Sequence, residues 1–224
     1  MALHLSSWQF ACVVLFAVSA ALFVWTALRR HRMDAALAGY GLAAPERRWT
    51  YDHDYIVRFL GALLRSPPSG QSSPYWLDFY AGPILRWDLA FAVCFATFIA
   101  LASVLISGAS GAPLWLSRVT FLTAAMGIVY GVADIAEDLK LRSILRNAVQ
   151  VHSKRQNDHD ELKTDLADAA EVDATNTLTR IKIATIGLSV VGLVAFLIFM
   201  GLAEISVFLA GGRPQGGAMV APQG

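Results

Sequence analysis

Three carboxylates at the end of one long apolar segment are the strongest candidates for chemistry in the chain. Asp134, Glu137 and Asp138 follow Gly127 and Gly131 in this segment. Residues three or four positions apart share a face of an α-helix, so the two glycines, Asp134 and Asp138 form one stripe. Small residues let helices approach closely in lipid. Clustered carboxylates in a partly dry site favour one another's protonated forms. The stripe is therefore both a packing face and a candidate proton or cation site.

A structural interpretation of the same carboxylates is a charge network that locks the inner ends of the helices. In this network three acids, Asp134, Glu137 and Asp88, face basic residues that lie at the same level of the membrane. The full candidate charge network or proton site consists of Asp134, Glu137, Asp138, Arg86, Asp88, Arg180 and Lys182. Both interpretations fit the sequence.

The spacing of charges in this apolar segment conflicts with the thickness of a bilayer. Arg118 and Asp134 are 16 positions apart, which corresponds to about 24 Å of helix. The hydrocarbon core of a bilayer is about 30 Å thick. Arginine reaches toward the headgroups along its flexible stem, whereas aspartate has almost no reach. Either Arg118 extends out of the apolar zone and leaves Asp134 at the cytoplasmic boundary, or Asp134 and Glu137 face a hydrated cavity among the helices, or these acids have a purely inter-subunit role.

Other kinds of site find little support in the residue types. All five histidines lie outside the predicted membrane spans, which excludes bis-histidine haem ligation inside the bundle. Cys12 and Cys94 both lie in apolar runs and form no CxxC motif. No Walker-type loop, HExxH motif or nucleophile elbow occurs in a suitable context. We therefore expect no enzymatic activity, no cofactor, no metal and no nucleic-acid partner.

The composition requires a lipid environment for much of the chain. Of the 224 residues, 56% are apolar, and the mean hydropathy is +0.51; a soluble domain has roughly 45–50% apolar residues. Several charge-free runs are long enough to cross a bilayer as helices. We predict an all-α membrane protein with four transmembrane helices at about 8–28, 84–107, 114–137 and 181–203.

Small residues in the second predicted span supply a surface that matches the glycines of the third. Ala92, Ala96 and Ala100 recur at four-residue spacing and form a ridge on one helix face. Such ridges let neighbouring helices approach closely in lipid. We expect this ridge to pack against Gly127 and Gly131.

Two polar segments, 29–83 and 138–180, separate these spans. In the first, apolar residues recur at helical spacing after Asp52, which predicts a short amphipathic helix capped by that residue. These apolar residues are Tyr55, Ile56, Phe59, Leu60, Leu63 and Leu64. In the second, the apolar face continues past the carboxylates and predicts a helical hairpin that extends spans three and four. Residues 1–210 should form one domain, and 211–224 a disordered tail.

Basic residues are distributed very unequally between the two sides of this arrangement. Residues 29–86 hold eight arginines and residues 137–182 hold eight lysines and arginines, which leaves only Arg118 and Arg213 for the other side. Cytoplasmic segments of membrane proteins are enriched in Lys and Arg. We therefore expect both long polar segments in the cytoplasm and both termini outside it.

Two stretches carry a recognisable pattern. The first is Tyr51–Leu64, followed by a second aromatic stretch and by Trp87-Asp88 at the head of a span; the second is Gly131–Leu145. Together they resemble a family of small four-span bacterial membrane proteins of unassigned function, in which an Asp-x-x-Glu-Asn element ends the third span. The resemblance covers about half of the chain, and Asp138 here replaces the asparagine. It implies a four-span protein of the bacterial inner membrane and implies no activity.

These observations favour a structural or interaction protein of the membrane, as a subunit or scaffold of an assembly. Its expected partners are the lipid bilayer and either another protein or a second copy of the chain. The alternative is a small proton- or cation-linked transporter or channel that uses the carboxylates at the end of the third span. Transporters usually show internal repeats or broken helices, and neither is found in the sequence.

Overall fold

A computed structural model describes residues 6–65, 75–108, 114–155 and 166–211. Within these ranges every regular element is a helix, which confirms the all-α prediction for this part of the chain. The elements are α1 (Ser7–Ala38), η1 (Pro45–Arg47), α2 (His53–Arg65), α3 (Tyr75–Phe79), η2 (Tyr80–Ile84), α4 (Leu85–Ser107), α5 (Leu114–Arg155) and α6 (Ala169–Gly211). The tip of the predicted hairpin lies outside the described residues, and so does the predicted disordered tail apart from Gly211, which ends α6.

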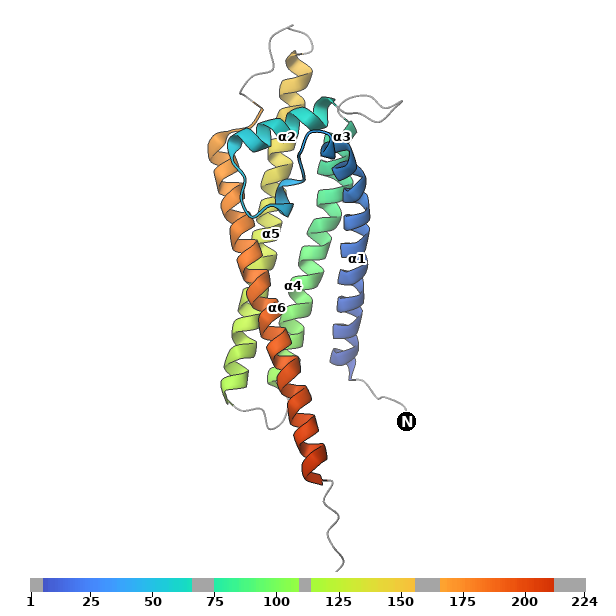
Figure 1. Cartoon of the computed structure of the whole chain (residues 1–224), viewed down its shortest axis with the longest axis vertical. Coiled ribbons are helices and arrows are strands. Elements are labelled where there is room, and N and C mark those ends of the chain that lie inside the picture. Colours follow the sequence, from blue (N-terminus) through green and yellow to red (C-terminus); the bar gives the residue numbers. More distant parts are fainter. Residues whose placement is uncertain (1–5, 66–74, 109–113, 156–165, 212–224) are drawn as a thin grey trace, which may run out of the picture.

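Four of the helical segments are long and apolar enough to cross a membrane, as predicted. They belong to α1, to the segment from α3 through α4, to α5 and to α6. In space α4 packs between α1 and α5, and α6 packs along α5 and crosses in front of it (Figure 1). Helix α1 begins and α6 ends at the same end of the bundle, opposite α2 (Figure 1). The chain is thus a multi-pass membrane protein with an even number of candidate spans.

All four long helices continue past the predicted spans at the end of the bundle that carries α2. Helix α1 runs ten residues beyond position 28 to Ala38, and the second helical segment already begins at Tyr75. Helix α5 continues to Arg155, and α6 begins at Ala169. The polar segments of the sequence are therefore largely helical and extend the bundle in one direction.

Burial divides the described part of the molecule into two zones. Exposed large apolar side chains lie along the predicted spans and include Trp8, Phe23, Val104, Phe121 and Leu188. The main cluster of buried apolar residues lies instead at the end that carries α2. It includes Met33, Leu37, Phe59, Leu63, Leu77, Ile144 and Leu145. One zone suits a lipid environment, while the other is packed like the core of a soluble domain.

Helix α2 lies across this end of the bundle (Figure 1). Asp52 caps it by accepting a hydrogen bond of 2.8 Å from the Tyr55 backbone N–H. The Tyr55 side chain and the other apolar residues predicted for this face are buried against the extended parts of α1, α5 and α6. His53 Nε2 lies 2.9 Å from the carbonyl oxygen of Ala167, just before α6. Protein, rather than lipid, therefore covers the apolar face of α2.

A wider helical turn joins α3 to α4. Residues Tyr80–Ile84 form a π-helical turn that contains Pro83. Proline has no backbone N–H to donate and clashes with the preceding turn of an ordinary α-helix, and π-turns are one way in which a helix absorbs such a disturbance. The turn buries the side chain of Tyr80 completely.

The contact between α4 and α5 is made at the two glycines of the predicted stripe. A Cβ atom on Gly131 would lie 2.6 Å from the Cβ of Ala96, and one on Gly127 would lie 2.5 Å from Ile99 Cγ2. Ala92 is buried at the same contact, and Ala100 is half-buried on α4. The two backbones are therefore as close as the absence of glycine side chains permits.

We expect Gly131→Ala to lower the free energy of unfolding by about 1–3 kcal/mol, because the new methyl group overlaps a neighbour that has no rotamer to change. Thermal unfolding in mild detergent, followed by tryptophan fluorescence, measures the change. Gly187→Ala is the matched control, since nothing lies within 4 Å of its added Cβ. Equal losses of stability in both variants would contradict this account of the contact.

Candidate functional site

Charged side chains from five separate elements converge at the junction of the two zones. They come from α1, η1, α4, α5 and α6, and their side chains are buried or nearly so. We call this set the charge cluster; its members are Arg30, Glu46, Asp88, Asp134, Glu137, Asp138 and Lys182. It contains five carboxyl groups and two cationic groups, all within electrostatic reach of other members.

One half of the charge cluster is centred on Lys182 of α6. Lys182 Nζ lies 2.8 Å from Asp134 Oδ1 and also forms an ion pair with Glu137 Oε2. Tyr130 donates a hydrogen bond of 2.9 Å to the other oxygen of Asp134, and Thr179 donates one to the other oxygen of Glu137. Every oxygen of these two carboxylates therefore has a partner, which is what burial of ionised groups requires.

The other half of the charge cluster is centred on Arg30 of α1. Its Nη2 atom lies 2.9 Å from Asp88 Oδ2 on α4 and 3.1 Å from Glu46 Oε1 on η1. The Tyr80 hydroxyl donates a hydrogen bond to the second oxygen of Glu46. One arginine thus ties α1 to α4 and to the loop that leads into α2.

Asp138 lies between these halves and differs from the other acids. It is 2% exposed, and neither carboxyl oxygen has a hydrogen-bond partner among the described residues. The charged groups that act on it are Asp88, Asp134, Lys182 and Glu137. Three of these four are carboxylates, so the surroundings of Asp138 are predominantly acidic.

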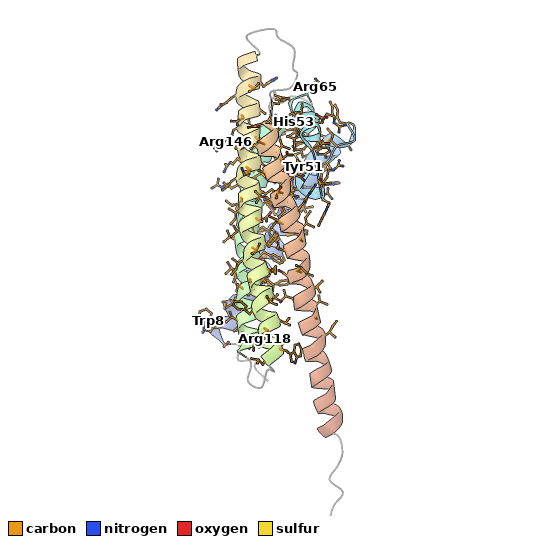
Figure 2. The ribbon with its side chains drawn as sticks, turned by 90° about the vertical axis from the view of Figure 1, so that its left-hand side faces the viewer. Trp8, Tyr51, His53, Arg65, Arg118 and Arg146 are labelled. Atoms are coloured by element: carbon orange, nitrogen blue, oxygen red, sulfur yellow. The ribbon has the colours of Figure 1, made fainter. Side chains whose placement is uncertain are left out.

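A chain of hydrogen bonds connects the charge cluster to a polar pocket on the surface. Tyr51 and Thr179 have their hydroxyl oxygens 3.2 Å apart, and Thr179 in turn donates to Glu137. Tyr51 also lines an open pocket of about 370 Å³, together with Asn176, Arg180 and six other residues. Burial raises the pKa of the Tyr51 hydroxyl, so it stays protonated and able to donate. Figure 2 shows Tyr51 near the α2 end of the bundle, far from Arg118.

The structure brings together some of the residues predicted for the site and leaves others outside it. Asp134, Glu137 and Lys182 form one group, whereas Asp88 pairs with Arg30 instead of a predicted partner. The remaining arginines of the predicted network, Arg86 and Arg180, are both exposed. Arg180 donates a hydrogen bond of 2.9 Å to the hydroxyl of Thr50. Each arginine lies two positions from a cluster residue on its own helix and so points to the opposite side.

The sequence pattern does not predict Arg30 or Glu46 as members of the site; both lie in the polar segment 29–83. Ser19, Thr26 and Met33 recur at seven-residue spacing on α1 and are buried. Arg30 lies on the same helix face, between Thr26 and Met33, and this spacing is the signal that indicates its inward position. Glu46 has no such signal, since it lies in a short turn without periodicity. Among the described residues, no group of three or more His, Cys, Asp or Glu side chains is placed to hold a metal ion.

Comparisons of the chain with family models, curated proteins and solved structures find no match. The resemblance to small four-span bacterial membrane proteins therefore stays a prediction. The features of the molecule that bear on its function are the charge cluster and the exposed faces of the helices.

We expect Lys182→Met to lower the free energy of unfolding by about 3–5 kcal/mol, because it leaves two buried carboxylates without their cation. Chemical or thermal unfolding in detergent measures this loss. Adding Asp134→Asn and Glu137→Gln to the same chain should recover much of it, since the unpaired charges are then removed. Arg180→Met is the control and should change stability by less than about 0.5 kcal/mol, as expected of an exposed side chain.

Proposed function

We propose that the protein is a structural or interaction protein of the bacterial inner membrane, acting as a subunit or scaffold of a membrane assembly. The observation that carries this proposal is an exposed face of small residues on α1, the helix at one edge of the bundle. Its partner is another transmembrane helix, from a second copy of the chain or from a different protein.

Helix α1 has one covered face and one uncovered face along the predicted span. Buried Ser19 and Thr26 mark the covered face, and Phe16 and Phe23 lie 5.3 and 5.8 Å from aromatic rings of α4, between ring centroids. The opposite face is exposed, with Phe10 and Leu28 near its two ends and mainly alanines and valines between them. This alanine face is formed by Val13, Ala17, Ala20, Ala21 and Val24.

Within the chain, α4 and α5 approach each other closely at residues of similarly small size. The α4–α5 contact relies on Gly127, Gly131 and Ala96. In lipid, van der Waals packing between small residues is a main source of helix association, because burial from lipid brings no hydrophobic gain. The alanine face offers the same means of association to a helix from outside the chain.

The proposed orientation places α2 and the ends of the long helices around it in the cytoplasm. Helices α5 and α6 then extend from the membrane as a cytoplasmic hairpin, and both termini are outside. This orientation is supported by the concentration of 16 of the 18 basic residues in residues 29–86 and 137–182. Alkaline phosphatase fused after residue 224 should be active, while a fusion after Gln150 should be inactive.

Self-association through the alanine face can be tested by cross-linking. In a Cys12→Ser, Cys94→Ser background, Ala20→Cys should form a disulfide-linked dimer on mild oxidation of native membranes. Val132→Cys is the matched control, since Val132 is 63% exposed on α5, away from α1, and should give little dimer. Equal cross-linking at both positions would indicate random collision. No dimer, together with no stoichiometric partner in a mild-detergent pull-down, would contradict the proposal.

A second candidate function is proton- or cation-linked transport, and one observation favours it. The chain Tyr51–Thr179–Glu137 links the surface pocket to buried carboxylates through hydroxyl groups that can pass protons. Ionisable residues inside membrane bundles frequently mark such paths. The charge cluster would then be a relay in addition to a structural tie.

Transport predicts a specific effect of Tyr51→Phe, which removes only the hydroxyl at the surface end of the hydrogen-bonded chain. Proton flux into liposomes that contain the purified protein, followed with a pH-sensitive dye, should fall to the level of empty liposomes. Tyr75→Phe removes a hydroxyl outside this chain and should leave the flux unchanged. Wild-type flux no greater than that of empty liposomes would reject the candidate.

A further inference from the structure

We propose that Asp138 is a proton-binding site and that its carboxyl group carries a bound proton at neutral pH. The bound proton belongs to the charge cluster itself, so the proposal holds whether the chain assembles with a partner or transports an ion. It rests on the balance of charges, on the lack of partners for Asp138 and on the mostly acidic groups around it.

The charge cluster contains three more carboxyl groups than cations. Arg30 and Lys182 are its two cationic members, and each already serves two acids. Buried ionised groups without a counter-charge are strongly disfavoured, and such groups become neutral instead. The cluster as a whole therefore favours uptake of a proton from water, which converts one carboxylate into a neutral acid.

Asp138 is the member for which the neutral form is most favoured. The other four acids each form an ion pair with Arg30 or Lys182, whereas Asp138 forms no ion pair with the described residues. Both carboxyl oxygens of Asp138 are buried, and no described residue donates a hydrogen bond to either of them. An ionised carboxylate in this position would have neither a counter-ion nor a donor.

The groups that face Asp138 from the surrounding helices reinforce this preference. Asp88 acts on it from α4, Asp134 and Glu137 from its own helix α5, and Lys182 from α6. Tyr80 of η2 and Tyr130 of α5 also interact with it electrostatically. Lys182 is the only cation in this set, and its ammonium group already forms ion pairs with two other acids.

A proton fits the site better than a metal cation does. Ca²⁺ takes roughly six to eight oxygen ligands and Mg²⁺ about six. No group of three or more acidic, histidine or cysteine side chains among the described residues is placed to hold a metal ion. A proton needs a single oxygen atom, and Asp138 supplies one.

Infrared spectroscopy of the purified protein in detergent tests this assignment directly. The wild-type protein at neutral pH should show the carbonyl stretch of a protonated carboxylic acid, and this band should move to lower frequency in D₂O. Asp138→Asn keeps the shape of the side chain and should abolish the band. Asp173→Asn, which changes an exposed aspartate of α6, should leave it unchanged. A band that persists in Asp138→Asn would overturn the proposal.

Isotope labelling keeps the test valid even if the Asp138→Asn variant fails to fold. In wild-type protein grown with ¹³C-carboxyl aspartate, the band should shift, and it should not shift when glutamate alone is labelled. No protonated-acid band in the wild-type protein would refute the assignment. Loss of the band when sodium or potassium is added at constant pH would also refute it, because a cation would then be displacing the proton.

Discussion

The arrangement of the long helices depends on one buried ammonium group between two carboxylates. Lys182 binds Asp134 and Glu137, and the hydroxyls of Tyr130 and Thr179 complete the coordination of their oxygens. Ion pairs in a dry environment tolerate few geometries, because any displaced partner leaves a charge without solvation. The pairing of α5 with α6 is thus fixed both along and around the helix axes. Arg30 of α1 likewise forms ion pairs with Glu46 of η1 and Asp88 of α4.

The two zones of the molecule are held together by different forces. In the predicted spans, helices meet where side chains are absent or small, as at Gly127 and Gly131, and the gain comes from close van der Waals contact. At the α2 end, a core that includes Phe59 and Leu145 is buried as in a soluble protein. The charge cluster lies between them, and its side chains are buried, or nearly so, by the surrounding protein.

The sequence predicts the features that depend on local periodicity and fails where the partner is distant in the chain. Apolar runs and small-residue spacing predict four long helices and the stripe on α5, and the basic residues at the start of span four suggest Lys182 as a partner for Asp134. Arg30 and Asp88 are 58 positions apart, and no local pattern couples them. Glu46 enters the cluster through a turn, and Tyr80 through a π-helical turn, which are conformations that helical periodicity does not encode.

The order of the charged residues along the chain imposes an order on assembly. The ribosome releases Asp134 and Glu137 before Lys182, so the third helix enters the membrane while its acids still lack their cation. Arg30 likewise emerges before Glu46 and long before Asp88. Until α6 is inserted, Asp134 and Glu137 have to stay in contact with water or keep their protons, because their cation is Lys182 of α6. Insertion of the last helix therefore supplies the cation that Asp134 and Glu137 lack, and a chain without α6 keeps these two acids unpaired.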